Sequence, residues 1–451
     1  MNINPSGINN DPKIKSFREL DPEVFQQKSQ NIRQAEPDDR FKKEDSDVEA
    51  LNIPGSGGDL FKSVQGSKDE SSPIPAKWTV MVYFNGNGDL EKDMEKNMAS
   101  LEKAGSDGNI NFVAQIARMS KKGEAQRVHL KKPSWMGLKN NSEVMDNLGP
   151  TNMAHPQSLK DFITWGMKKF PAERYALIMN GHGMGFVGSM PDELSKDFMS
   201  TPEFESAVKV ATKEAGRKID VLGFDSCLMA TAETAYSAKD AANFMIASQE
   251  VVIAGNWDYE KFGNEMKEKA GGQGLSVGDA LEAIVKSQYN NRLLTSSIID
   301  LRRMPEFADK LKDFSHRLLS TTEPDYRIRS CFRKAQHYCQ RHIIASASNG
   351  GNINTKPMDQ LRDVASVALH IITDDNIGDI ELKKSALNLA RFTSEKAVIF
   401  EMHRKKYGLD QSKGMSIYAP TSEAEGFADY YNKISLSEDT GWGKVVEKFG
   451  T

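Results

Sequence analysis

Five segments rich in apolar residues stand out along the chain, and stretches with helical periodicity separate several of them. The five segments are rich in β-branched and aromatic residues, which is typical of strands buried on both faces of a sheet. They occupy residues 77–84, 111–117, 174–180, 219–227 and 243–250. Between them, residues 158–170 place apolar side chains at helical spacing, and residues 201–216 begin with Thr-Pro, a frequent helix start.

This alternation predicts an α/β fold, a mostly parallel sheet with helices on both faces. Residues 126–132 alternate between apolar and polar, as an edge strand does. From about residue 275 onward the pattern is mainly helical, and we predict helices over 277–288, 303–320, 358–372 and 381–403. One late strand, at 413–420, is expected to rejoin the core.

The composition divides the chain into three predicted parts. Residues 1–75 are polar, with isolated apolar positions, and predict a disordered arm or prosegment. An α/β domain follows over 76–275, and a mainly helical region over 276–451. A chain of 451 residues has room for a large core and for two or three domains.

Charge and cysteine content exclude several classes of protein. The net charge is −4, from 59 basic and 63 acidic residues, so neither nucleic acid nor an anionic membrane is an expected partner. The start of the chain lacks a secretory pattern, and no apolar run has the length of a membrane helix. We expect a monomer that is cytoplasmic, or exported without a cleavable signal. Three cysteines form no disulfide framework, so free thiols are expected.

Two reactive side chains lie where predicted strands end. His182 follows the strand at 174–180, in Asn-Gly-His-Gly, and Cys227 ends the strand at 219–227. In a parallel sheet, the carboxyl ends of neighbouring strands lie about 5 to 10 Å apart and form the usual ligand site. A histidine beside a cysteine favours the reactive thiolate. The backbone N–H groups of Gly183 and Cys227 would then form an oxyanion hole.

Alone, each residue has a simpler explanation. Cys227 by itself is more often a buried core thiol, and a carboxylate such as Asp225 often accepts backbone hydrogen bonds in a turn. Together, however, Cys227 and His182 favour a cysteine nucleophile. Asp225 precedes Cys227 by two positions, so in an extended strand its carboxylate faces the same side and is placed to bind a cationic substrate side chain.

Two other groups of residues are weaker candidates for a functional site. Cys331, His337 and Cys339, on a predicted helix, lack the spacing and the fourth ligand of a zinc site. Asn85–Asp89 (NGNGD) follows a strand but lacks the remaining residues of a phosphate-binding loop, and we interpret it as a turn.

Three motifs of this sequence resemble those of the clostripain family of cysteine peptidases, which are relatives of caspases, legumain, gingipains and separase. WTVMVYFNGNGDLE, RYALIMNGHG and VLGFDSCLMA are similar to that family's first strand, His motif and Asp-x-Cys motif. The resemblance is dense over 77–260, thinner to 451, and excludes 1–75. It implies a caspase-like fold, a His182–Cys227 dyad without an essential third residue, and protein or peptide substrates cleaved after Arg or Lys, with Asp225 in the pocket.

The resemblance implies no required cofactor, although some relatives depend on Ca²⁺. The carboxylates available here are Asp192, Glu193 and Asp197, which lack the spacing of an EF-hand, so Ca²⁺ stays optional. It also implies self-processing between His182 and Cys227, where Lys196 is the one basic residue of a polar segment, and cleavage there would leave two associated chains.

Two departures from the family pattern concern specificity. Ala117 stands where the family has an acidic residue, and a Pro-Gly loop before a Trp is replaced by Ala254–Trp257. Glu250 and Asp258 are candidates for a second pocket carboxylate. Two alternatives remain: an inactive caspase-like binding module, and a peptidase with another specificity. Arg118, at a strand end, would permit a specificity for acidic substrate side chains.

Overall fold

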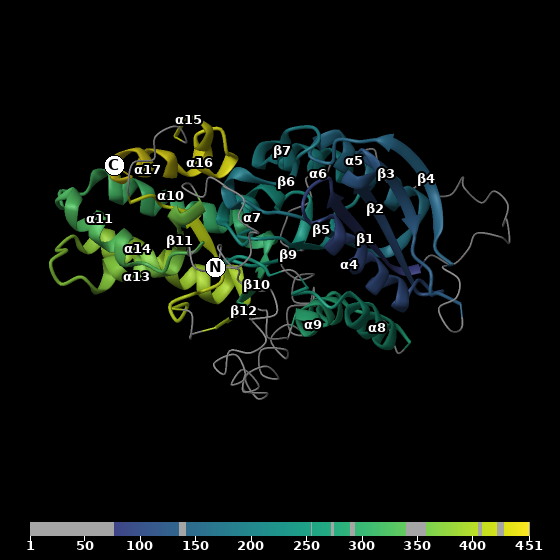
Figure 1. Ribbon diagram of the computed structural model, residues 1–451. Coiled ribbons are helices and arrows are strands. Elements are labelled where there is room, and N and C mark those ends of the chain that lie inside the picture. Colours follow the sequence, from purple (N-terminus) through teal and green to yellow (C-terminus); the bar gives the residue numbers. More distant parts are fainter. Residues whose placement is uncertain are drawn as a thin grey trace, which may run out of the picture.

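A nine-stranded sheet forms the centre of the protein, in the strand order β12-β10-β9-β8-β5-β1-β2-β3-β4 (Figure 1). The computed structural model describes residues 76–134, 141–253, 255–271, 275–288, 294–339, 358–404, 408–421 and 428–450. The five central strands run parallel. They are β1 (Ala76–Gly86), β2 (Ile110–Arg118), β5 (Ala172–Asn180), β8 (Ile219–Asp225) and β9 (Ala242–Ala247), and each overlaps one of the apolar segments.

Antiparallel strands extend both sides of this parallel centre. On one side β3 (Glu124–His129) pairs with β2, and β4 (Glu143–Pro150) forms the edge beyond it. The edge position predicted for 126–132 is therefore wrong, because β4 covers it. On the other side lie β10 (Thr295–Asp300) and β12 (Val398–His403).

The strand β12 also corrects the helix predicted over 381–403. Helix α14 (Ile380–Phe392) ends in a π-helical turn, Thr393–Ala397, and the chain then pairs with β10. Val398, Ile399 and Phe400 are β-branched or aromatic, which favours the extended conformation once a sheet edge is available.

Helices cover both faces of the sheet, because alternate strand residues point to opposite sides. Met81 and Tyr83 pack with one set of helices, and Val80 and Val82 with the other. The first set is α5 (Pro156–Lys169), α6 (Thr201–Ala215) and α7 (Ala232–Ala238). The second is α4 (Glu91–Ala104), α8 (Tyr259–Ala270) and α9 (Val277–Gln288). The predicted α/β/α sandwich is confirmed.

The C-terminal part is mainly helical and shares its core with the α5–α7 face. Its helices are α10 (Met304–Ser320), α11 (Asp325–Lys334), α13 (Val364–Thr373), α14, α15 (Ala428–Tyr431), α16 (Ser435–Thr440) and α17 (Trp442–Phe449). In Figure 1 they gather at one end of the molecule. The late strand, β13 (Ser416–Tyr418), pairs with β11 (Leu361–Asp363) in a separate two-stranded sheet rather than with the large one.

Two further predictions concern particular segments. The predicted arm, 1–75, lies outside the described residues. Within the parts of the chain that the structure describes, no helix is long and apolar enough to cross a membrane.

Candidate active site

His182 and Cys227 occupy equivalent places at the carboxyl ends of two neighbouring strands. Strands β5 and β8 pair in parallel, with Asn180 opposite Asp225 at the last position. Each reactive residue follows two positions later. Strand β5 therefore ends at the predicted residue, whereas β8 ends two residues earlier than predicted. Gly183 lies directly against Cys227, since a Cβ placed on Gly183 would come 2.1 Å from the Cys227 carbonyl oxygen. Glycine is required at this close approach.

The sulfur of Cys227 is held by the loop that follows β9. The backbone N–H of Val252 donates a hydrogen bond to Sγ at 3.2 Å, and Sγ lies 3.7 Å from the Val252 carbonyl oxygen. Burial raises the pKa of the thiol to about 11, and the charges of Glu250 and Asp225 add to the effect. The raised pKa favours the neutral thiol over the thiolate at neutral pH, and it is the thiolate that acts as a nucleophile.

The imidazole of His182 has a carboxylate partner that the sequence did not reveal. Its Nε2 lies 2.8 Å from Oδ1 of Asp89, in the turn between β1 and α4. The hydrogen bond with His182 holds the pKa of Asp89 below its usual range. Asp89 belongs to the NGNGD stretch, whose prediction as a turn misses this contact. The available signal was position, because β1 pairs with β5 and ends at the same edge of the sheet.

Backbone donors lie close to the two reactive side chains. The N–H of Met190 donates to the His182 carbonyl oxygen, and the N–H of Met184 donates to Gly188. Among the described residues, none accepts a hydrogen bond from the N–H of Gly183 or of Cys227. The oxyanion hole expected at these two N–H groups stays a prediction.

Asp225 ends β8 and is almost fully buried, with 9 % of its surface exposed. Its Oδ2 accepts hydrogen bonds from Asn180 Nδ2 at 2.9 Å and from the Tyr259 hydroxyl at 3.1 Å. Burial raises the pKa of Asp225 to about 7, and the Tyr259 hydrogen bond opposes this rise. Because a turn begins after Asp225, the alternation of an extended strand does not continue to Cys227.

The two candidates for a second carboxylate have structural contacts. Glu250 is fully buried, and its Oε1 accepts hydrogen bonds from the backbone N–H groups of Val251 and Cys339. Asp258 is exposed and caps α8 by accepting a hydrogen bond from the N–H of Lys261. Their contribution to a substrate pocket stays a prediction.

The C-terminal part supports the loop that holds Cys227. Gln249 in this loop donates from Nε2 to Asp363 Oδ2 at 3.0 Å and accepts a hydrogen bond from the N–H of Gly414 at 2.9 Å. Asp363 is the last residue of β11, and Gly414 precedes β13. The reactive thiol therefore depends on residues beyond the predicted boundary at 275.

Arg118, at the end of β2, is already paired. Its Nε lies 3.0 Å from Glu95 Oε1, and its Nη1 donates to Gln126. With its charge matched by Glu95, this guanidinium is poorly suited to bind an acidic substrate side chain.

The segment that contains Lys196 forms an antiparallel hairpin of β6 (Gly188–Asp192) and β7 (Asp197–Ser200), more regular than the open connection we predicted. Lys196 is exposed in its turn and adopts a left-handed conformation, with φ of 51°. The carboxylates of Asp192 and Asp197 accept hydrogen bonds from Asn87 and Asn152. No cluster of side chains suited to a metal ion occurs in the described ranges.

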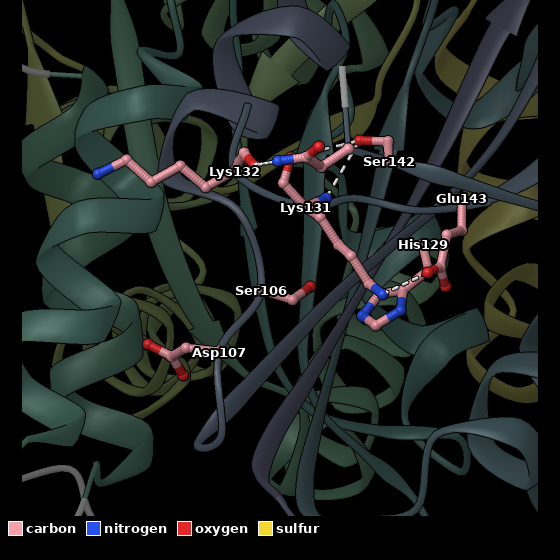
Figure 2. A pocket seen from close by; sticks show the side chains of 8 residues that line it. Ser106, Asp107, His129, Lys131, Lys132, Ser142 and Glu143 are labelled. Carbon is pink, nitrogen blue, oxygen red and sulfur yellow. Dashed lines mark hydrogen bonds and ion pairs between the residues drawn. The ribbon is translucent and has the colours of Figure 1, made fainter. Parts of the chain in front are cut away.

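The remaining candidates lie elsewhere. Helix α11 ends at Lys334, so the helix predicted to reach Cys339 is wrong. Figure 2 shows a hollow lined by side chains at the end of β3, at the start of β4 and in the segments next to them, and by Ser106 and Asp107. His129, in its wall, pairs with Val113 in the first half of β2, so the hollow lies at the opposite end of the sheet from Cys227.

Sequence comparisons match this chain to a known protein family. The clostripain family profile matches residues 82–449. Clostripain from Hathewaya histolytica is 26% identical over an alignment of 227 residues that covers 44% of this chain and 43% of that protein, so the match spans under half of the relative's length.

Solved structures share the fold. A secreted C11 cysteine protease from Bacteroides thetaiotaomicron, in complex with an irreversible peptide inhibitor, aligns with a TM-score of 0.59 at 16% identity, covering 81% of this chain and 99% of that one. An inactive zymogen C11 protease from Parabacteroides distasonis aligns with a TM-score of 0.60 at 19% identity, covering 82% and 99%. Since the family profile covers most of the sequence, the chain belongs to the clostripain family.

Proposed function

We propose that the protein is a cysteine endopeptidase that cleaves peptide bonds after Arg or Lys, with Cys227 as the nucleophile and His182 as its acid–base partner. The observation that carries this proposal is the placement of His182 and Cys227 at equivalent ends of adjacent parallel strands, with Gly183 against the Cys227 carbonyl. The chain's membership of the clostripain family supports it.

In the proposed reaction, His182 takes the proton from Cys227 Sγ, and the sulfur attacks the carbonyl carbon of the scissile bond. The N–H groups of Gly183 and Cys227 donate hydrogen bonds to the oxygen that becomes negative, a contribution of about 3 to 4 kcal/mol where such donors have been removed. His182 then gives its proton to the leaving amine as the C–N bond breaks. Water hydrolyses the remaining thioester and restores the thiol.

The preference for basic side chains rests on Asp225. This carboxylate is buried at the same end of the sheet and, among the described residues, forms no ion pair with Lys, Arg or His. An unpaired buried carboxylate is costly, and a guanidinium or ammonium group from a substrate would compensate its charge. Arg118, which would serve an acidic preference, is matched by Glu95.

Self-processing at Lys196 is part of the same proposal. Lys196 is exposed, and its hairpin adjoins the site, because Met190 of β6 donates a hydrogen bond to the His182 carbonyl. Cleavage requires the turn to open into an extended strand. No cofactor is assigned, because the proposed chemistry uses only side chains and backbone groups of this chain.

Fluorogenic peptides that differ only in the residue before the scissile bond test the proposal. We expect turnover with Arg and Lys, little with citrulline or Asp, none in Cys227→Ala, and normal turnover in Cys331→Ala. An inactive relative would cleave nothing, and a peptidase of another specificity would favour Asp or citrulline. Full activity in Cys227→Ala would contradict the assignment of the nucleophile.

A further inference from the structure

Asn180 and Tyr259 form a closed triangle of hydrogen bonds with Asp225. Asn180 Nδ2 donates to Asp225 Oδ2 at 2.9 Å and to the Tyr259 hydroxyl oxygen at 2.5 Å. The Tyr259 hydroxyl in turn donates its own proton to Asp225 Oδ2 at 3.1 Å. Every donor of the triangle is therefore used, and each side chain fixes the direction of the other two.

The triangle is rigid because its members end or begin regular elements and are buried. Asn180 is the last residue of β5 and Tyr259 the first of α8, and their exposed fractions are 1% and 0%. The Tyr259 ring lies between Phe84 and Trp257, with centroid distances of 5.9 and 6.1 Å. Burial raises the pKa of Tyr259 well above its usual range, so its hydroxyl stays protonated and remains a donor.

Both hydrogen bonds to Asp225 end on the same oxygen. Within the described part of the chain, Oδ1 of Asp225 accepts no hydrogen bond. The carboxylate thus has one oxygen fixed by the protein and one left for a ligand. A single free oxygen beside a neutral pair of donors suits a cationic group, since a neutral ligand would leave the negative charge without compensation.

Among the described residues, Asp225 forms no ion pair with a basic side chain. Cys227 lies beyond the end of β8 with a raised pKa, and Glu250, whose charge also raises that pKa, is acidic. The imidazole of His182 is turned to Asp89. The charge of Asp225 is therefore stabilised by hydrogen bonds alone, and the donor from Tyr259 works against the burial that raises its pKa.

We propose that Asn180 and Tyr259 are positioning residues for substrate charge: they direct Oδ1 of Asp225 to the basic side chain and favour the ionised carboxylate over the protonated acid. This inference rests on the proposed function of Asp225. It assigns the preference for Arg or Lys to a set of three residues on β5, β8 and α8, and it gives the preference a pH dependence that the cysteine chemistry does not share.

Binding to the full-length Cys227→Ala protein separates this effect from catalysis. The probes are two peptides with Arg or its neutral isostere citrulline at the cleavage position, and the measurement is calorimetry from about pH 5.5 to about 9. The ratio of the two affinities should rise with pH as Asp225 ionises. In Tyr259→Phe its midpoint should move up by about one pH unit, and the preference at pH 7 should fall about tenfold, because a donor to the charged form is lost.

Two further variants complete the test. Asn180→Ser, in case Tyr259→Phe does not fold, should shift the midpoint in the same direction. Tyr83→Phe is the matched control, because it removes a buried hydroxyl that donates to Met153 on the opposite face of the sheet, and its midpoint should not move.

The outcomes separate the two levels of the proposal. An unchanged midpoint and preference in both Tyr259→Phe and Asn180→Ser would overturn the positioning role and leave Asp225 as the charge determinant. Equal binding of the Arg and citrulline peptides by Cys227→Ala at every pH would instead refute the proposed specificity, and the positioning role with it.

Discussion

Oδ1 of Asp89 lies 2.8 Å from Nε2 of His182, so a turn at the end of β1 orients the imidazole at the end of β5. A carboxylate bound to one ring nitrogen fixes the plane of the ring and the nitrogen that carries the proton. With Nε2 bound to Asp89, Nδ1 is the ring nitrogen left for the proton transfers that we propose between His182, Cys227 and the leaving group. In that proposal Asp89 acts through His182 as a positioning residue.

The Asp89→Asn variant should lose activity by about tenfold or more in kcat, on Arg and citrulline peptides alike, because the imidazole loses its charged partner. The Asp89 pKa is below its usual range, so the pair forms at neutral pH and is lost as pH falls through that pKa. The acid limb of the kcat profile should therefore change in the variant. Asp93→Asn, which removes a partly exposed carboxylate that pairs with Lys96, is the control. Equal kcat values in Asp89→Asn and Asp93→Asn would exclude the role of Asp89.

Thiol labelling distinguishes Cys227 from the other two cysteines. Cys227 is partly exposed, whereas Cys331 and Cys339 are buried. Iodoacetamide should therefore label Cys227 first, as measured by peptide mass spectrometry. Because burial raises the Cys227 pKa to about 11, the labelling rate should increase about tenfold per pH unit over the neutral and mildly alkaline range. A rate that is already constant at neutral pH would show that the thiolate is stabilised.

Replacement of Asp225 by Asn tests the pocket directly. The specificity constant for Arg peptides should fall about ten- to a hundredfold, since a charge-assisted hydrogen bond contributes about 1.5 to 3 kcal/mol. Citrulline peptides should lose less, because they carry no charge to bind. Steady-state kinetics with both peptides decides the point: equal losses would mean that Asp225 supports the loop rather than the substrate.

The hairpin prediction concerns Lys196. Purified wild-type protein should give two associated fragments, one ending at Lys196 and one beginning at Asp197, while Cys227→Ala stays a single chain. Denaturing gels and N-terminal sequencing identify the cut. Lys196→Ala should remain whole and less active, whereas Lys213→Ala, in the last turn of α6, should mature normally. A Lys196→Ala protein that is cut and fully active would rule out this site.

The parallel centre of the sheet and the placement of His182 and Cys227 just beyond the ends of adjacent strands could be predicted, because buried strands appear as runs rich in apolar residues and end at one edge. Edge strands were harder. Strand β4 has several exposed residues and no apolar run, since its outer side has no neighbour to contact. Strand β12 follows a helix without a break in apolar spacing. Asp89 was missed because its role comes from a tertiary contact between two turns.

The pairing of β5 with β8 could also hold the protein together if the chain between these two strands were cut. Five residue pairs, from Ala176 with Val221 to Asn180 with Asp225, join the two strands, and the hairpin between them lies outside the large sheet. A chain broken in that hairpin would be a heterodimer whose subunits share a single sheet. The two pieces, encoded by separate genes, should then assemble on co-expression, which would turn the enzyme into a split reporter whose signal depends on fragment association.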